Sequence, residues 1–121
     1  VWASLPVAKD FFINTPVDSA YAKSKTEVRI CYDRKNIYIF ATCYNSRKGP
    51  YVIESLKRDF SYSNSDAFSI VIDPYDDHTN GFNFGINPYR AQLEGLIQNG
   101  GTFCGSISWD NVWYSKVKRH Y

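Results

Sequence analysis

The sequence predicts an all-β protein of antiparallel strands, arranged as a sandwich or a barrel. Aromatic residues make up 17% of the 121 residues, and aromatic side chains favour strands. Apolar and polar residues alternate with a period of two over several short stretches, which turn residues separate. No stretch has the apolar spacing of a long amphipathic helix. The length is that of one domain, residues 1–121, which can bury a core without disulfides.

The clearest predicted hairpin covers residues 26–45, TEVRICYDRKNIYIFATCYN. A four-residue turn at Asp33–Asn36 places Ile30 opposite Ile39, and the period of two then holds along both arms. We expect one face to lie in the core; it carries Val28, Ile30, Tyr32, Ile37, Ile39, Ala41 and Cys43. Cys31 lies on the other face, so we expect buried free thiols here rather than a disulfide.

A second hairpin is predicted at residues 66–87, after a polar, turn-rich connection at 45–65. Its two arms alternate in the same way, and each arm has one apolar face. The apolar positions are Phe68, Ile70 and Ile72 in the first arm and Phe82, Phe84 and Ile86 in the second. A further strand is predicted at 91–98, and the sequence NGG at 99–101 ends it in a turn.

Charge and composition exclude several classes of protein. The formal net charge is +2, which gives no electrostatic reason to expect a nucleic acid or a membrane surface as partner. No stretch approaches the roughly 20 apolar residues of a membrane-spanning helix, so we expect no membrane insertion. The three cysteines have no zinc-site spacing. The opening residues lack the pattern of a signal peptide, and we expect a fragment of a longer chain.

Catalysis within this chain is not expected. Hydrolysis of a glycosidic bond needs two carboxylates roughly 5–10 Å apart across a cleft. Asp76 and Asp77 are adjacent in a turn, which makes them a poor acid–base pair. His78 and His120 have no evident serine or cysteine partner. We therefore expect a binding or structural domain rather than an enzyme.

The order of motifs resembles the family 9 carbohydrate-binding module-like domain of large bacterial secreted or outer-membrane proteins. The resemblance runs from about Trp2 to Trp113. It rests on TEVRICYD followed by IYIFATCY, the Arg58–Asp59 pair, the strand from Asp66 with its acidic loop, NP followed by Gln92, and WDNVW. This resemblance implies a jelly-roll-like antiparallel β-sandwich that is incomplete at its C-terminal end, since such domains continue with further strands.

The resemblance also implies what the domain does. It would be a non-catalytic module that binds polysaccharide or oligosaccharide, in a parent protein linked to carbohydrate catabolism and hydrolysis of O-glycosyl bonds. The location would be secreted, periplasmic or outer-membrane associated. The alternative is a structural or protein-interaction domain that has kept the fold and lost the sugar site. An incomplete sandwich leaves unpaired edges, which would favour a homo-oligomer.

Several side chains have the chemistry of a sugar site. Sugar rings stack their C–H faces on aromatic rings, and polar side chains bind the hydroxyl groups. The candidate platforms are Trp109, Trp113 and Tyr89, and the candidate polar partners are Asn87, Arg90, Gln92 and Glu94. The alternative for each tryptophan is ordinary packing in the core or at its rim. For the Arg58–Asp59 pair, a structural role and a ligand role are both open.

The acidic loop between the arms of the second hairpin has two interpretations. Asp73, Asp76 and Asp77 could supply carboxylates to a bound Ca²⁺, which takes six to eight oxygen ligands. However, the loop does not follow the spacing of an EF-hand calcium loop. Proline followed by Tyr-Asp-Asp also suits a tight polar turn. The sequence leaves calcium and a simple polar turn as alternatives.

Overall fold

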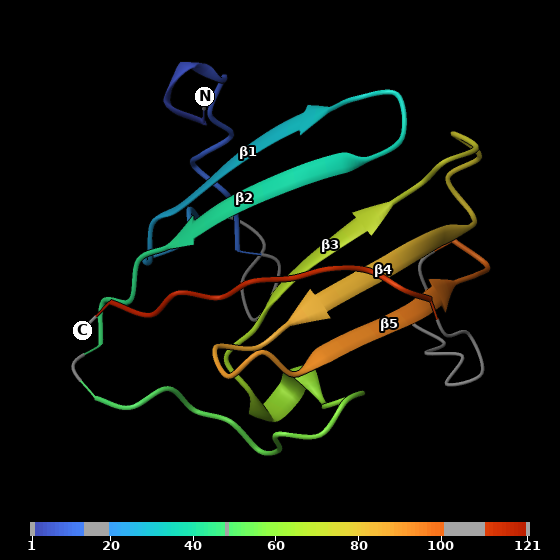
Figure 1. The fold of residues 1–121 in the computed structure, drawn as a ribbon. Helices are drawn as coiled ribbons and strands as arrows, with labels where there is room; N and C mark the ends of the chain where they lie inside the picture. Colours follow the sequence, from blue (N-terminus) through green and yellow to red (C-terminus); the bar gives the residue numbers. More distant parts are fainter. Residues whose placement is uncertain (1, 14–19, 48, 101–110, 121) are drawn as a thin grey trace. The chain divides into compact units, whose positions relative to one another are not determined.

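The computed structural model describes residues 2–13, 20–47, 49–100 and 111–120, and it is all-β, as the sequence predicts. Its five strands form one two-stranded and one three-stranded antiparallel sheet (Figure 1). Two 3₁₀ turns, η1 (Trp2–Ser4) and η2 (Tyr62–Asn64), are the helical elements of the described residues. The chain divides into two compact units, Val1–Gly49 and Pro50–Tyr121.

The first unit is built on the predicted hairpin. Strands β1 (Thr26–Tyr32) and β2 (Ile37–Cys43) are antiparallel, and Ile30 pairs with Ile39 in the predicted register. The Asp33 carboxylate closes the turn, because its Oδ1 accepts hydrogen bonds from the backbone N–H groups of residues 35 and 36 at 2.7 and 2.8 Å. This is the local bonding for which aspartate is favoured in turns.

The prediction that this face of the hairpin lies in the core is wrong for most of its length. Val28 is buried, but Ile30, Ile37 and Tyr32 are 52%, 58% and 81% exposed. Cys43 is also exposed, contrary to the expectation of a buried thiol, and both Cys31 and Cys43 are free. A two-stranded hairpin has no second layer of its own. The alternation of apolar and polar residues therefore predicts which side chains share a face. It does not predict whether another part of the chain covers that face.

The second unit contains a three-stranded sheet in the order β3 (Phe68–Ile72), β4 (Gly81–Ile86) and β5 (Gln92–Ile97). Ile70 pairs with Phe84, and Phe84 pairs with Glu94. Because paired residues share a face, the apolar positions of both arms lie on one side of the sheet, as predicted. Glu94 and Gln92 lie on that same side.

The other side of this sheet is covered by the connection that precedes β3. Phe60 from this connection is buried with Ala91 and Leu93, and Tyr62 packs against the cluster. The rings of Phe60 and Tyr62 meet edge to face with centroids 5.5 Å apart. The Tyr62 hydroxyl accepts a hydrogen bond from the Asn83 side chain at 3.3 Å. The connection is thus a layer of the second unit rather than a loose linker.

In the part of the chain that the structure describes, no helix is both long and apolar enough to cross a membrane.

The close approach of Tyr62 to the sheet gives the first prediction. A Cβ at residue 85 would overlap the Tyr62 phenol oxygen, so the strand needs glycine there. We expect Gly85→Ala to lower the free energy of unfolding by about 1–3 kcal/mol, the usual cost of overpacking. Urea denaturation measures this, with Val71→Ala on an exposed strand position as the control.

A second variant separates the overlap from any general effect on strand β4. Tyr62→Phe removes the oxygen nearest to the new methyl group, so the double variant should lose less stability than the sum of the two single losses. Additive losses would show that Tyr62 is not what excludes a side chain at Gly85.

Candidate functional site

The C-terminal segment, residues 111–120, crosses the sheet of the second unit (red in Figure 1). It is held by side chains of β4 and β5. The Trp113 ring meets the Phe84 ring edge to face, with centroids 5.5 Å apart. The Gln92 side-chain amide donates to the Trp113 carbonyl at 3.3 Å and to the Ser115 hydroxyl at 2.8 Å. The segment therefore lies on the face that carries Glu94 and Gln92.

Glu94 is the centre of this arrangement. The residue is only 5% exposed, and its Oε1 forms an ion pair with the Arg58 guanidinium. Its Oε2 accepts a hydrogen bond from the Trp113 indole N–H at 3.0 Å, and Oε1 accepts one from the Asn111 backbone at 3.4 Å. A buried carboxylate is tolerated when charge and hydrogen bonds compensate it. Here the compensating groups come from two distant segments.

Arg58 extends this network to the connection. Besides pairing with Glu94, it donates to the backbone carbonyl of Asn111 at 3.4 Å. The neighbouring Asp59 has a backbone N–H that donates to the Gln92 carbonyl at 3.0 Å. The structural role considered for the Arg58–Asp59 pair thus has a concrete form, because the pair attaches the connection to β5.

The turn between β4 and β5 is built around the Asn87 side chain. Asn87 is 1% exposed, and its Oδ1 accepts hydrogen bonds from the backbone N–H groups of Tyr89 and Ala91 at 2.9 and 3.0 Å. Its Nδ2 donates to the Ser55 carbonyl at 3.2 Å. These hydrogen bonds occupy the Asn87 side-chain amide within the turn. They leave Tyr89 and Arg90 at the surface.

Tyr89 also has a partner that the sequence did not indicate. The Arg119 guanidinium carbon lies 4.5 Å from the centroid of the Tyr89 ring, within the range of a cation–π interaction. The basic end of the chain resembles a solvated tail in sequence. Its contact with Tyr89 joins residues thirty positions apart, for which a local pattern gives no signal.

The structure brings some of the predicted sugar-binding residues together. Trp113 contacts both Gln92 and Glu94, and Tyr89 and Arg90 are exposed on the adjoining turn. Asn87 is buried within that turn. Trp109 lies outside the described residues.

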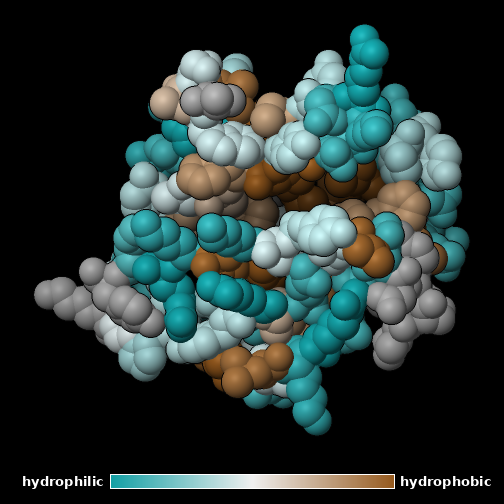
Figure 2. All heavy atoms as spheres, in the orientation of Figure 1, coloured by the Kyte–Doolittle hydropathy of each residue, from teal (hydrophilic) through white to brown (hydrophobic). Residues whose placement is uncertain are grey.

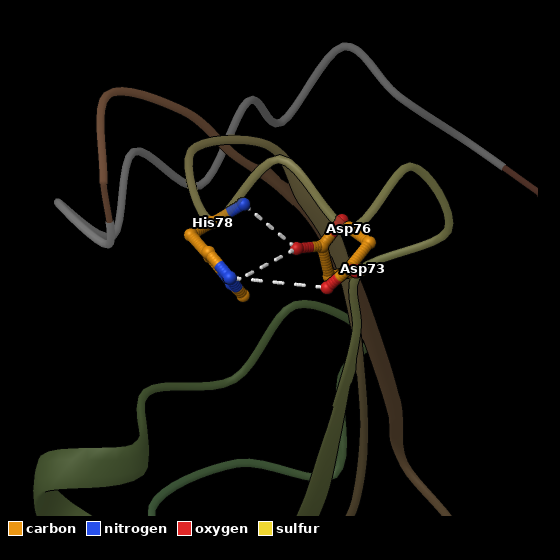
Figure 3. A group of neighbouring side chains, drawn as sticks. All are labelled: Asp73, Asp76 and His78. Atoms are coloured by element: carbon orange, nitrogen blue, oxygen red, sulfur yellow. Dashed lines mark hydrogen bonds and ion pairs between the residues drawn. The ribbon is translucent and has the colours of Figure 1, made fainter.

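The acidic loop brings together Asp73, Asp76 and His78 (Figure 3). Their potential ligand atoms all lie within 4.8 Å of one another. The His78 Nδ1 is 3.9 Å from Asp73, and its Nε2 is 3.8 Å from Asp76. The Asp73 carboxylate also accepts the His78 backbone N–H at 2.9 Å, which is the main cause of the lowered pKa of Asp73. His78 was not among the predicted metal-binding residues.

Asp77, the third predicted metal ligand, is occupied with the turn itself. Its Oδ1 accepts the backbone N–H groups of Thr79 and Asn80 at 2.8 and 2.7 Å. Its Oδ2 accepts the Asn80 side-chain amide at 2.8 Å. Hydrogen bonds from Asn80, then from the Thr79 backbone, hold the pKa of Asp77 well below its usual range. Asp77 thus shapes the loop, and Asp73 does so in part.

The three clustered side chains of this loop are not by themselves a calcium site. Ca²⁺ takes six to eight oxygen ligands, whereas the group in Figure 3 offers two carboxylates and an imidazole, all exposed. Imidazole nitrogen suits zinc or another transition metal better than a hard oxygen-seeking ion. The hydrogen bonds of Asp73 and Asp77 are those of a polar turn, and that interpretation accounts for the loop without a metal.

Comparison of the chain with protein-family models, with curated proteins and with solved structures finds no match. The resemblance to the family 9 module-like domain therefore rests on the sequence motifs alone, and the function has to be inferred from the side chains and their contacts.

The lowered pKa of Asp77 gives the second prediction. Its carboxylate is favoured in the folded state, so its contribution to stability is present above its unfolded pKa of about 3.9 and is lost as pH falls through the lower folded value. We expect Asp77→Asn, which keeps an oxygen for the two backbone N–H groups, to lose less stability than the wild type on acidification below about pH 4.

Urea midpoints measured at neutral and acidic pH test this expectation. Asp76→Asn is the matched control, because it removes a charge from the same loop at a side chain with no backbone hydrogen bond among the described residues. An acid response of Asp77→Asn identical to that of the wild type would show that Asp77 does not hold the loop.

Proposed function

We propose that this chain is a non-catalytic carbohydrate-binding module with a jelly-roll-like β-sandwich fold, within a larger secreted or envelope-associated protein. Reversible binding would keep the parent protein close to a polysaccharide. Any hydrolysis of glycosidic bonds would be the work of another part of that protein. The support comes from the arrangement around Trp113 and from the order of the sequence motifs.

The observation that carries this proposal is the fixed position of the Trp113 ring. Its N–H is bound by Glu94, and the ring meets Phe84 edge to face, while the residue stays partly exposed. A ring that is already held in place loses little conformational entropy when a sugar stacks on it. Such a ring is a suitable platform for the C–H face of a pyranose, with Gln92 close by as a polar neighbour.

The proposed roles are assigned from these contacts. Trp113 and Tyr89 would stack on sugar rings, and Arg90 and Gln92 would bind hydroxyl groups at the rim. Glu94 is a positioning residue, since its oxygens are already engaged by Arg58 and by the indole.

The third prediction tests the platform. Trp113→Ala should weaken binding to a glycan found by array screening by at least about tenfold, since loss of a central aromatic contact typically costs more than about 1.4 kcal/mol. Titration calorimetry measures the affinity, and circular dichroism verifies folding. Trp2→Ala is the control, because Trp2 stacks on Phe40 within the first unit.

If Trp113→Ala binds the glycan with unchanged affinity, Trp113 is not part of the binding site. A screen of neutral and acidic polysaccharides that finds no binding, with and without calcium, would contradict the proposed function itself.

A second candidate function is a protein-interaction domain, favoured by the exposed apolar face of the first unit. Ile30, Ile37 and Tyr32 are each more than half exposed. Such apolar exposure is not unusual for this chain, since the face of the molecule drawn in Figure 2 has apolar side chains, in brown, at the surface among polar ones in teal. Exposed apolar patches mark association surfaces. For this candidate the partner would be a second copy of the chain, paired through strand edges.

The fourth prediction belongs to this candidate. Sedimentation at micromolar concentration should show a dimer, and Ile37→Glu should convert it to a monomer, because a charge at an apolar interface is costly. Arg34→Glu, at an exposed position of the same hairpin, is the matched control and should leave the dimer intact. A wild-type monomer would exclude this candidate.

A further inference from the structure

Tyr89 is next to one basic residue in the chain and contacts another in space. Arg90 follows it in the turn, and Arg119 lies over its ring. Lys116 and Lys118 precede Arg119 in the C-terminal segment, and all four cationic residues are exposed. The sequence contains no aspartate or glutamate between residues 87 and 92 or between 111 and 121. The nearest acidic residue along β5, Glu94, is buried and paired with Arg58.

The Arg119 guanidinium lies over the Tyr89 ring and is exposed. A guanidinium that lies on an aromatic face still has its N–H donors in the plane of the group, pointing outward. That edge matches the two oxygens of a carboxylate, which it can bind through two parallel hydrogen bonds. The ring contact, 4.5 Å from the Tyr89 centroid, restricts the orientation of this donor.

The turn between β4 and β5 fixes the backbone of Tyr89 and Arg90. Asn87 binds the backbone of Tyr89 and Ala91, and the Arg90 N–H donates to the Asn87 carbonyl at 3.0 Å. Arg90 has a φ of 70°, a conformation that a side chain adopts at some cost unless its surroundings impose it. The backbone that carries Tyr89 and Arg90 is therefore set before any ligand arrives.

From these contacts we propose that Tyr89, Arg90 and Arg119 form a subsite for an acidic sugar, in which the carboxylate of a uronic acid residue binds the two guanidinium groups beside the tyrosine ring. This inference rests on the proposed carbohydrate-binding function and specifies its ligand. Neutral polysaccharides would use the stacking platforms alone, whereas polyuronates would add the carboxylate contact to the two arginines.

The fifth prediction compares two forms of one ligand. Oligogalacturonate and its methyl ester share a backbone and differ in charge, so a subsite for the carboxylate should bind the free acid at least about tenfold more tightly. Arg119→Ala should remove most of this preference, so that the acid and the ester bind with similar affinity. Arg119→Lys should restore only part of it, because an ammonium group cannot make the paired hydrogen bonds.

Matched controls separate the subsite from general attraction. Lys57→Ala removes one positive charge from an exposed position of the same unit and should leave the preference intact. Sulfated dextran and a DNA oligonucleotide test for other anions, and both should bind more weakly than the oligogalacturonate. The urea midpoint of each variant verifies folding.

The outcomes distinguish this inference from the function on which it rests. Equal affinity for acid and ester, with the Trp113 effect intact, would overturn the acidic-sugar subsite alone. A loss in Lys57→Ala equal to that in Arg119→Ala, or DNA or sulfated dextran bound as tightly as oligogalacturonate, would also overturn it. If no glycan binds, both proposals fall.

Discussion

The buried carboxylate of Glu94 is the interaction on which the second unit depends. It joins Arg58 of the connection, Trp113 and Asn111 of the C-terminal segment, and strand β5 in one network. Removing one partner of such a network leaves the others desolvated and unpaired, which costs far more than the pair itself gains. The carboxylate therefore makes the positions of two irregular segments depend on each other, although neither segment belongs to the sheet.

The sheet of this unit is covered differently on its two sides. On one side, Phe60 and Tyr62 pack against Leu93 and Ala91 and bury apolar area. On the other, Gln92 and Glu94 hold the C-terminal segment through polar side chains. Apolar packing is non-directional, whereas hydrogen bonds to an indole and to backbone carbonyls fix orientation. The side that carries Gln92 and Glu94 is thus the one on which an aromatic ring is held in a defined position.

Local patterns predicted the strands well and the contacts between distant segments poorly. The hairpin register followed from a turn residue, Asp33, and a period of two, both of which lie within one short stretch of sequence. Whether Ile30 and Ile37 are covered depends on a second layer, which alternation does not encode. The pairing of Arg58 with Glu94 and of Arg119 with Tyr89 joins residues far apart in the sequence.

In the acidic loop, too, the local sequence did not predict which side chains contact each other. Its composition indicated the right segment for a cluster of potential metal ligands. Composition could not separate Asp77, which shapes the turn, from His78, which faces the carboxylates. The roles of neighbouring residues in a loop depend on which of them bind the backbone, and that is decided by the path of the chain.

The position of Cys43 has a consequence for the chemistry of the chain. The residue is exposed, yet loss of water around its sulfur raises the pKa of the thiol. The thiolate is the form that reacts with oxidants and with other thiols, so this cysteine stays mostly in its unreactive form near neutral pH. The exposure of this sulfur therefore overstates its reactivity, since a thiol with a raised pKa forms less of the thiolate that attacks disulfides and oxidants.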